Sequence, residues 1–185
     1  MTRPISISTP LRESDILSLR AGDRVLLQGV IYTARDAAHR RFAELLRDGK
    51  ELPINLQGHV IYYTGPAPGR PDTVIGPAGP TTSGRMDSYT IPLLEAGLKG
   101  MIGKGDRGEP VIKAIKKHTA VYFAATGGAA VLLSRRIKKA TIAAYPDLGP
   151  EAVLRLEVED FPVIVAIDCR GRNLYQAPRL NQSGS

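Results

Sequence analysis

The stretch RVLLQGVIYT at residues Arg24–Thr33, followed by ARDAAHRR at residues 34–41, decides the fold class. The first part is rich in Val, Leu and Ile, which is typical of a buried β-strand. In the second part Asp36 is a candidate helix N-cap, and apolar residues then recur at helical spacing up to Gly49. The sequence therefore predicts a strand that passes directly into a helix.

The same alternation continues along the chain. Buried strands are predicted at residues 59–63, 100–102 and 120–125, and helices at residues 91–98, 109–117 and 129–137. Two late strands, at residues 153–158 and 163–168, are joined by the short connection EDFP, which suggests an antiparallel addition. Residues 1–22 read as a polar lead-in with one short helix. Together these elements predict an α/β fold with a mixed sheet.

The length of 185 residues predicts a single domain. We place it at residues 1–175, and we expect residues 176–185, QAPRLNQSGS, to form a flexible tail.

Composition excludes several classes of protein. No apolar run approaches the roughly 20 residues that span a bilayer, and the N-terminal stretch lacks the apolar core of a signal peptide. We therefore expect a cytoplasmic protein without a membrane partner. The single cysteine, Cys169, cannot form an internal disulfide. It also cannot hold a zinc or iron-sulfur site, which takes about three or four protein ligands, so we expect no metal bound by this chain.

The formal net charge of +7 points to an acidic partner or substrate. Nucleic acid is one such partner, but the basic residues are scattered, aromatic residues make up 5% and Trp is absent. The sequence thus offers no basic strip with aromatic side chains on which bases stack. We expect no nucleic-acid binding, whereas a small dicarboxylate fits the charge.

The junction at residues 33–41, TARDAAHRR, is the first candidate site. A helix that begins where a strand ends directs backbone N–H groups and a positive helix end outwards, which suits carboxylates and phosphates. Arg35 can add a bidentate fork for a carboxylate. The alternative is that Arg35 pairs with Asp36 or another acid at the surface. His39 is predicted as a polar residue on the helix face rather than a catalytic base.

The loop GPAGPTTSGRMD at residues 76–87 is the second candidate. It presents Thr81 and Thr82, and Arg85 arrives at the start of the following helix. Hydroxyls and backbone amides beside an arginine make an anion-binding cradle. An ordinary turn with a Ser or Thr N-cap is the alternative.

The loop GKGDRG at residues 103–108 is the third candidate and formally matches the G-x-G-x-x-G dinucleotide pattern. The acidic residue expected about 20 positions later is missing. The pattern of a P-loop also fails, because Gly105 follows Lys104 where Ser or Thr is required. Lys104 remains as a point charge for a carboxylate, or alternatively as a solvated surface lysine.

Taken together, ARDAAHRR at 34–41, GPTTSGRMD at 79–87 and GKG at 103–105 resemble, in order and spacing, the C-terminal domain of class I fumarate hydratases. The resemblance covers nearly the whole chain. It implies a swivelling β/β/α domain and the reversible hydration of fumarate to (S)-malate. It also implies a 4Fe-4S cluster, ligated by a separate α subunit, whose open iron acts as a Lewis acid.

The resemblance also implies roles for individual residues. Arg35, Arg85 and Lys104 would bind substrate carboxylates, and Thr81 and Thr82 would lie against the substrate. Thr81 is the candidate base. This chain would be the β subunit, active only with its α partner, and an α2β2 assembly is expected. The L-tartrate dehydratase β subunit resembles the chain in the same motifs and is the alternative. A non-catalytic anion- or nucleotide-binding module built on GKGDRG is the second alternative.

Overall fold

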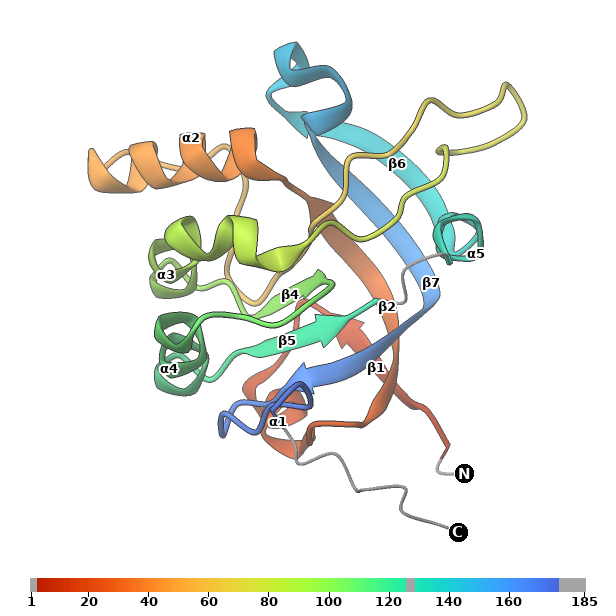
Figure 1. Ribbon diagram of the computed structural model, residues 1–185. Helices are drawn as coiled ribbons and strands as arrows, with labels where there is room; N and C mark the ends of the chain where they lie inside the picture. Colours follow the sequence, from red (N-terminus) through yellow and green to blue (C-terminus); the bar gives the residue numbers. More distant parts are fainter. Residues whose placement is uncertain (1–2, 126–128, 177–185) are drawn as a thin grey trace, which may run out of the picture.

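The computed structural model describes residues 3–125 and 129–176, in which seven strands form one mixed sheet (Figure 1). The strand order is β1-β2-β3-β4-β5-β7-β6, and an additional pairing of β2 with β7 closes β2, β3, β4, β5 and β7 into a barrel. The strands are β1 (Ile5–Thr9), β2 (Arg24–Thr33), β3 (Val60–Tyr62), β4 (Gly100–Gly103), β5 (Val121–Ala124), β6 (Ile137–Ala144) and β7 (Val153–Ile167). The α-helices are α1 (Glu13–Ser18), α2 (Asp36–Arg47), α3 (Asp87–Glu95), α4 (Glu109–Lys117) and α5 (Ala130–Ser134), and the 3-10 helices are η1 (Ser83–Met86) and η2 (Pro146–Glu151).

Two apolar clusters lie on the two faces of the barrel strands. In β3, Val60 and Tyr62 belong to the cluster inside the barrel, which also contains Phe161 of β7. Ile61 and the following Tyr63 belong to the outer cluster. Helices α2, α3 and α4 lie side by side and cover this outer face (Figure 1). The alternation of buried side chains along each strand thus produces a filled barrel with one helical layer.

The predicted mixed α/β architecture is confirmed, and most elements lie where the sequence placed them. Strand β2, helix α2 and helix α4 agree with the prediction. The described part of the chain contains no helix with both the length and the apolar character needed to cross a membrane.

The two edge strands, β1 and β6, were not predicted from the sequence. Part of the polar lead-in forms β1, which pairs in parallel with β2. The predicted helix at residues 129–137 is too long, because α5 ends at Ser134 and the chain continues as β6. Lys138 and Lys139 are exposed on this strand. Charged residues are common on edge strands, where they discourage pairing with other chains.

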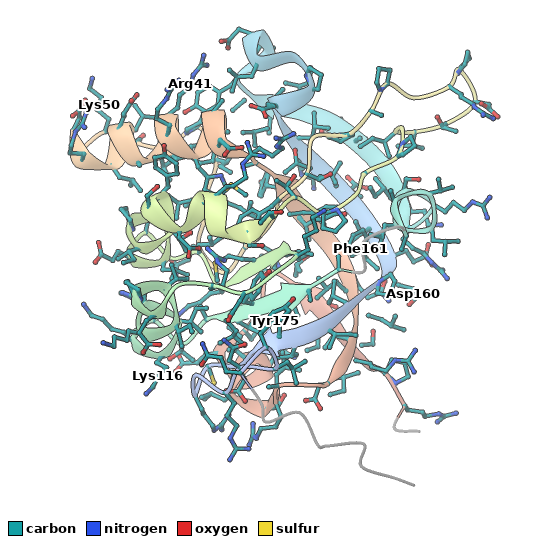
Figure 2. All side chains as sticks on the ribbon, in the orientation of Figure 1. Arg41, Lys50, Lys116, Asp160, Phe161 and Tyr175 are labelled. Carbon is teal, nitrogen blue, oxygen red and sulfur yellow. The ribbon has the colours of Figure 1, made fainter. Side chains whose placement is uncertain are left out.

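Strand β7 is continuous, so the prediction of two strands at residues 153–158 and 163–168 is wrong. It bends at Asp160, which has a φ of 50° and lies beside Phe161 (Figure 2). Gln28 of β2 stabilises the bend, since its Nε2 donates to Asp160 Oδ1 at 2.6 Å and its Oε1 accepts the Asp160 N–H at 3.1 Å. The expected antiparallel addition to the sheet is present, but it is made by this single strand, because the bend lets β7 pair with β6, β2 and β5.

His39 lies on the inner face of α2, so its predicted position on a polar helix face is wrong. Its side chain is fully buried, and its ring stands edge-on to Tyr63 at 5.2 Å between centroids. Nδ1 lies 2.8 Å from the backbone oxygen of Arg35, and because a carbonyl only accepts, Nδ1 carries the proton. Nε2 is buried with no hydrogen-bond partner among the described residues. Burial lowers the pKa of His39 to about 4, and the nearby charge of Arg107 acts in the same direction.

This buried imidazole predicts a loss of stability in mild acid. The folded protein protonates His39 near pH 4, whereas the unfolded chain does so near pH 6.5. The contribution of His39 is therefore fully present above pH 6.5 and is lost as the pH falls towards 4. Linkage gives a loss of about 2 kcal/mol in the free energy of unfolding between about pH 7.5 and about pH 5. We expect urea unfolding of His39→Gln to show a loss smaller by about that amount. An identical pH dependence in the two chains would contradict the assignment.

Candidate functional site

The parallel strands β2, β3 and β4 end at the same edge of the sheet, and the predicted anion-binding residues follow these ends. Strand β2 pairs in parallel with β3, and β3 pairs in parallel with β4. Arg35 comes after β2, and Lys104 comes after β4. In α/β barrels and open α/β sheets alike, the edge at the carboxyl ends of parallel strands is where loops and helix N-termini form ligand sites.

The segment that carries Thr81 and Thr82 lies between the ends of β3 and β4. The Thr81 N–H donates to the carbonyl oxygen of Tyr63 at 2.7 Å, and the Lys104 N–H donates to the Thr81 carbonyl at 3.2 Å. The Ser83 N–H donates to the Lys104 carbonyl at 2.9 Å. Thr82 and Lys104 form a parallel β-bridge. The backbone therefore brings the predicted catalytic threonines beside Lys104, whose side chain is exposed.

Gly103 allows these two loops to approach each other. A Cβ atom at Gly103 would lie 1.9 Å from Ser83 Oγ, so a side chain here would displace Ser83. The hydroxyl of Tyr122 lies 2.8 Å from Ser83 Oγ and donates to the Gly105 carbonyl at 2.7 Å. Burial raises the pKa of Tyr122, so the phenol keeps its proton. Since that proton goes to Gly105, Ser83 Oγ is the donor towards Tyr122.

Asp36 joins the two predicted arginines. Arg85 on η1 donates from Nε to Asp36 Oδ1 at 3.0 Å, and Arg35 Nη2 lies 3.8 Å from Asp36 Oδ2. Arg35 Nε also lies 3.3 Å from Glu151 Oε1. The pairing of Arg35 with a neighbouring acid, one of the two alternatives from the sequence, is therefore present. A simple surface pair does not, however, account for the second arginine on the same carboxylate.

An open hollow of about 260 Å³ lies beside this ion-pair cluster. It is lined by Asp36, Ala37, Arg40, Arg85, Tyr89 and Glu151. The Arg35 side chain lies along Gly65, where a Cβ atom would be 3.1 Å from Arg35 Nη1. Of the predicted site residues Arg85 lines the hollow, whereas Arg35, Thr81 and Lys104 do not. The structure thus brings the predicted residues together as two neighbouring groups, linked by residues 81–85.

Arg107, Asp87 and Glu151 are polar residues near the site that sequence reasoning missed. Arg107 is 3% exposed, and its Nε donates to Asp87 Oδ1 at 2.6 Å. The Gly108 N–H donates to Asp87 Oδ2 at 2.7 Å. In a dinucleotide site the backbone N–H at the start of this helix would point at the pyrophosphate. Here the N–H at the start of α4 is already bonded to the carboxylate of Asp87. This agrees with the rejection of GKGDRG as a dinucleotide motif.

The described residues do not provide ligands for an iron-sulfur cluster. Within residues 3–125 and 129–176, no three His, Cys, Asp or Glu side chains gather as a group that could hold a metal ion. Cys169 is buried, and its Sγ lies 3.7 Å from the backbone oxygen of Ile16.

Comparison with known proteins relates nearly the whole chain to one family. The family model described as Fumarase C-terminus matches residues 1–178. The chain is 40% identical over 177 residues to "Fumarate hydratase class I, anaerobic" of Escherichia coli (strain K12), which covers 93% of this chain and 32% of that protein. It is 41% identical over 157 residues to "Fumarate hydratase 2" of Leishmania major, which covers 83% of this chain and 28% of that protein.

A relative of similar length carries a subunit name. The "Putative L(+)-tartrate dehydratase subunit beta" of Methanocaldococcus jannaschii is 38% identical over 172 residues, which is 90% of this chain and 88% of that protein. This chain thus spans about a third of the fumarate hydratases that it matches and most of the tartrate dehydratase subunit. The resemblance inferred from the three motifs is confirmed, and the chain belongs to the Fumarase C-terminus family.

Proposed function

We propose that this chain is the β subunit of a two-subunit hydro-lyase that adds water reversibly to fumarate to give (S)-malate. The observation that carries the proposal is the edge of the sheet where two cationic groups lie next to each other: Arg35 and Arg85 both pair with Asp36, and Lys104 is bonded to the segment that begins at Thr81. Guanidinium groups bind carboxylates through paired, charge-assisted hydrogen bonds. The names of the relatives, class I fumarate hydratase and tartrate dehydratase, support a hydro-lyase.

Asp36 and Glu151 prepare the arginines for a dicarboxylate. Long side chains lose rotamer freedom when they bind, and a side chain already held in place loses less. Asp36 bonds to the Nε of Arg85 and leaves the two terminal nitrogens of that guanidinium free of this contact. A substrate carboxylate can bind there, beside the hollow. Lys104 adds a point charge from the neighbouring loop.

Thr81 is our candidate for the proton transfer between its Oγ and the substrate carbon, with Thr82 lying against the substrate. A threonine hydroxyl is a poor base at neutral pH. The role therefore needs positive charge nearby that favours the deprotonated oxygen, and Arg35, Arg85 and Lys104 can supply it. The backbone bonds of Thr81 to the ends of β3 and β4 fix where the hydroxyl is presented.

We infer that a second chain, an α subunit, completes the enzyme. The donor set of the described residues does not fit a 4Fe-4S cluster, so we assign its ligands to the partner. Bound there, the cluster would supply a Lewis acid for the substrate hydroxyl. The matched fumarate hydratases extend well beyond the region shared with this chain, which supports a partner that carries the rest. We propose an α2β2 assembly.

We further propose that the barrel and its helical layer are a swivelling β/β/α domain at residues 1–175. The barrel strands on one side and helices α2, α3 and α4 on the other support this description. Of the proposed tail at residues 176–185, only Gln176 lies within the described residues.

L-tartrate is the alternative substrate, favoured by the name of the relative from Methanocaldococcus jannaschii, "Putative L(+)-tartrate dehydratase subunit beta". Both substrates carry two carboxylates, so the cationic residues alone do not separate them. A nucleotide-binding module has less support, because Arg107 and Gly108 of the GKGDRG loop are both bonded to Asp87.

Catalysis is expected from the pair of chains and not from this chain alone. The chain is co-purified with a partner that carries the cluster cysteines, iron and sulfide are measured, and activity is assayed on fumarate, (S)-malate and L-tartrate. We expect the pair to hydrate fumarate and the isolated chain to be inactive, because the cluster belongs to the partner. Hydration by the isolated chain, or a loaded pair inactive on every substrate, would contradict the proposal. A clear preference for L-tartrate would select the alternative.

Replacing Thr81 separates chemistry from binding. If its hydroxyl transfers the proton, Thr81→Ala in the reconstituted pair lowers kcat by about 100- to 10,000-fold. KM should change little, because the cationic residues remain. Thr81→Ser keeps the hydroxyl and is expected to retain much more of the activity. Near-normal turnover by a folded Thr81→Ala enzyme would remove Thr81 from the mechanism.

Replacing Arg85 tests carboxylate binding. Hydrogen bonds to a charged partner contribute about 1.5–3 kcal/mol, so Arg85→Met should lower kcat/KM by about 10- to 150-fold, chiefly through a higher KM. Arg47→Met is the matched control, because Arg47 is 74% exposed at the end of α2 and pairs with the adjacent Asp48. The measurement is kcat and KM for fumarate in the two variants. Equal KM values in the two variants would argue against a role for Arg85.

A further inference from the structure

We propose that Arg107 is a positioning residue that fixes the loop carrying Lys104 against the segment carrying Thr81 and Arg85. This inference rests on the proposed function, since its purpose is to place those three side chains. Arg107 acts through its neighbours and not on the substrate, because its own side chain is fully buried.

The guanidinium of Arg107 bonds to groups that come from separate parts of the chain. Nε donates to Asp87 Oδ1 at 2.6 Å and Nη2 donates to Thr90 Oγ1 at 2.8 Å, both on α3. Nη1 lies 3.3 Å from the hydroxyl of Tyr63, which follows β3. The rings of Tyr63 and Tyr122 have centroids 5.4 Å and 5.1 Å from Arg107 Cζ. One side chain thus contacts α3, the end of β3 and strand β5.

Asp87 converts this contact into a link between the two loops. It accepts from Arg107 through Oδ1 and from the Gly108 N–H through Oδ2, so it holds two consecutive residues of the Lys104 loop. Asp87 is also the first residue of α3 and follows η1, which carries Arg85. The position of Lys104 relative to Arg85 is therefore set by this short path.

The rest of the loop is held from its other side. Asp106 Oδ1 accepts from Asn173 Nδ2 at 2.7 Å and from the Arg107 N–H at 2.7 Å. The carbonyl of Gly105 accepts from the hydroxyl of Tyr122. All four residues that follow Lys104 are thus hydrogen-bonded, while the Lys104 side chain itself remains exposed.

Buried contacts also connect Arg107 to Arg35, the third of the cationic site residues. The Tyr63 ring that faces Arg107 also meets the edge of His39, and His39 donates to the Arg35 carbonyl. Burying a charge is costly, and an apolar side chain would fill the same space without that cost. An apolar side chain cannot, however, make directional bonds to α3 and to the Tyr63 hydroxyl. Geometric control is therefore the feature that only the guanidinium provides.

The test compares Arg107→Lys with Arg12→Lys in the reconstituted pair. Lysine keeps the charge but lacks the planar fork, so it cannot bond Asp87 and Thr90 in the same geometry. Arg12 is the matched control, because it makes two hydrogen bonds to Asp15 at the surface, and its neighbour Leu11 bonds to Gly58, which precedes β3 and so lies at the opposite edge of the sheet from the candidate site. A displacement of about 1 Å can cost about 100-fold in rate. We expect a fall of that order in kcat/KM for Arg107→Lys, with a raised KM, and none for Arg12→Lys.

Amide hydrogen exchange on the same chains gives a readout independent of activity. We expect faster exchange at Ser83, Lys104 and Gly108 in Arg107→Lys, and wild-type exchange at these amides in Arg12→Lys. Wild-type kinetics in folded Arg107→Lys would overturn the proposal, as would unchanged exchange at the three amides.

Two further outcomes are also decisive. If the wild-type pair is inactive on all substrates, the proposed function fails, and with it the role of Arg107 in that reaction. The exchange result still shows whether Arg107 holds the loops.

If Arg107→Lys does not fold, Thr90→Val removes one acceptor and keeps the Arg107–Asp87 pair. We then expect a rise in KM of about 3-fold or more, with faster exchange at the same amides. Wild-type values for both would overturn the proposal.

Discussion

Three backbone hydrogen bonds hold residues 81–83 between the ends of β3 and β4, and the remainder of the candidate site is built on them. They extend the parallel sheet by one short segment beyond its strand ends. Because of this extension, the chain passes Lys104 at close range before it turns into η1 and α3. The closed barrel behind supplies a rigid support, since β3 and β4 are packed on both faces.

Two arginines at this edge are each paired with an aspartate at the first position of a helix. Asp36 is the first residue of α2 and pairs with Arg85, and Asp87 is the first residue of α3 and pairs with Arg107. Negative charge is favourable at a helix start, where the backbone N–H groups are unpaired. Each aspartate thus stabilises its own helix and holds an arginine that comes from elsewhere in the chain. The two pairs differ in exposure, since the Arg85 side chain is 52% exposed and that of Arg107 is fully buried.

Sequence reasoning located the strands and helices whose apolar pattern is strong, such as β2 and α4, and it placed Arg35, Thr81 and Lys104 after strand ends. It missed β1 and β6, because edge strands with one solvated side carry little apolar signal. It also missed the burial of His39 and Arg107. Whether a polar side chain is buried depends on partners distant in sequence, here Tyr63 for both residues. Local sequence likewise does not reveal the hydrogen bonds that the hydroxyls of Tyr63 and Tyr122 make.

The contact between Gly103 and Ser83 has a consequence for how such a sequence can change over evolution. A methyl group at position 103 and a hydroxymethyl group at position 83 compete for one space. Substitutions at these two positions are therefore not independent. A side chain gained at 103 would force the Ser83 hydroxyl out of its present position, or require its loss, and either change removes one of the two hydrogen bonds of the Tyr122 hydroxyl. Covariation between two loops about 20 residues apart would thus reflect simple exclusion of volume rather than any difference in substrate.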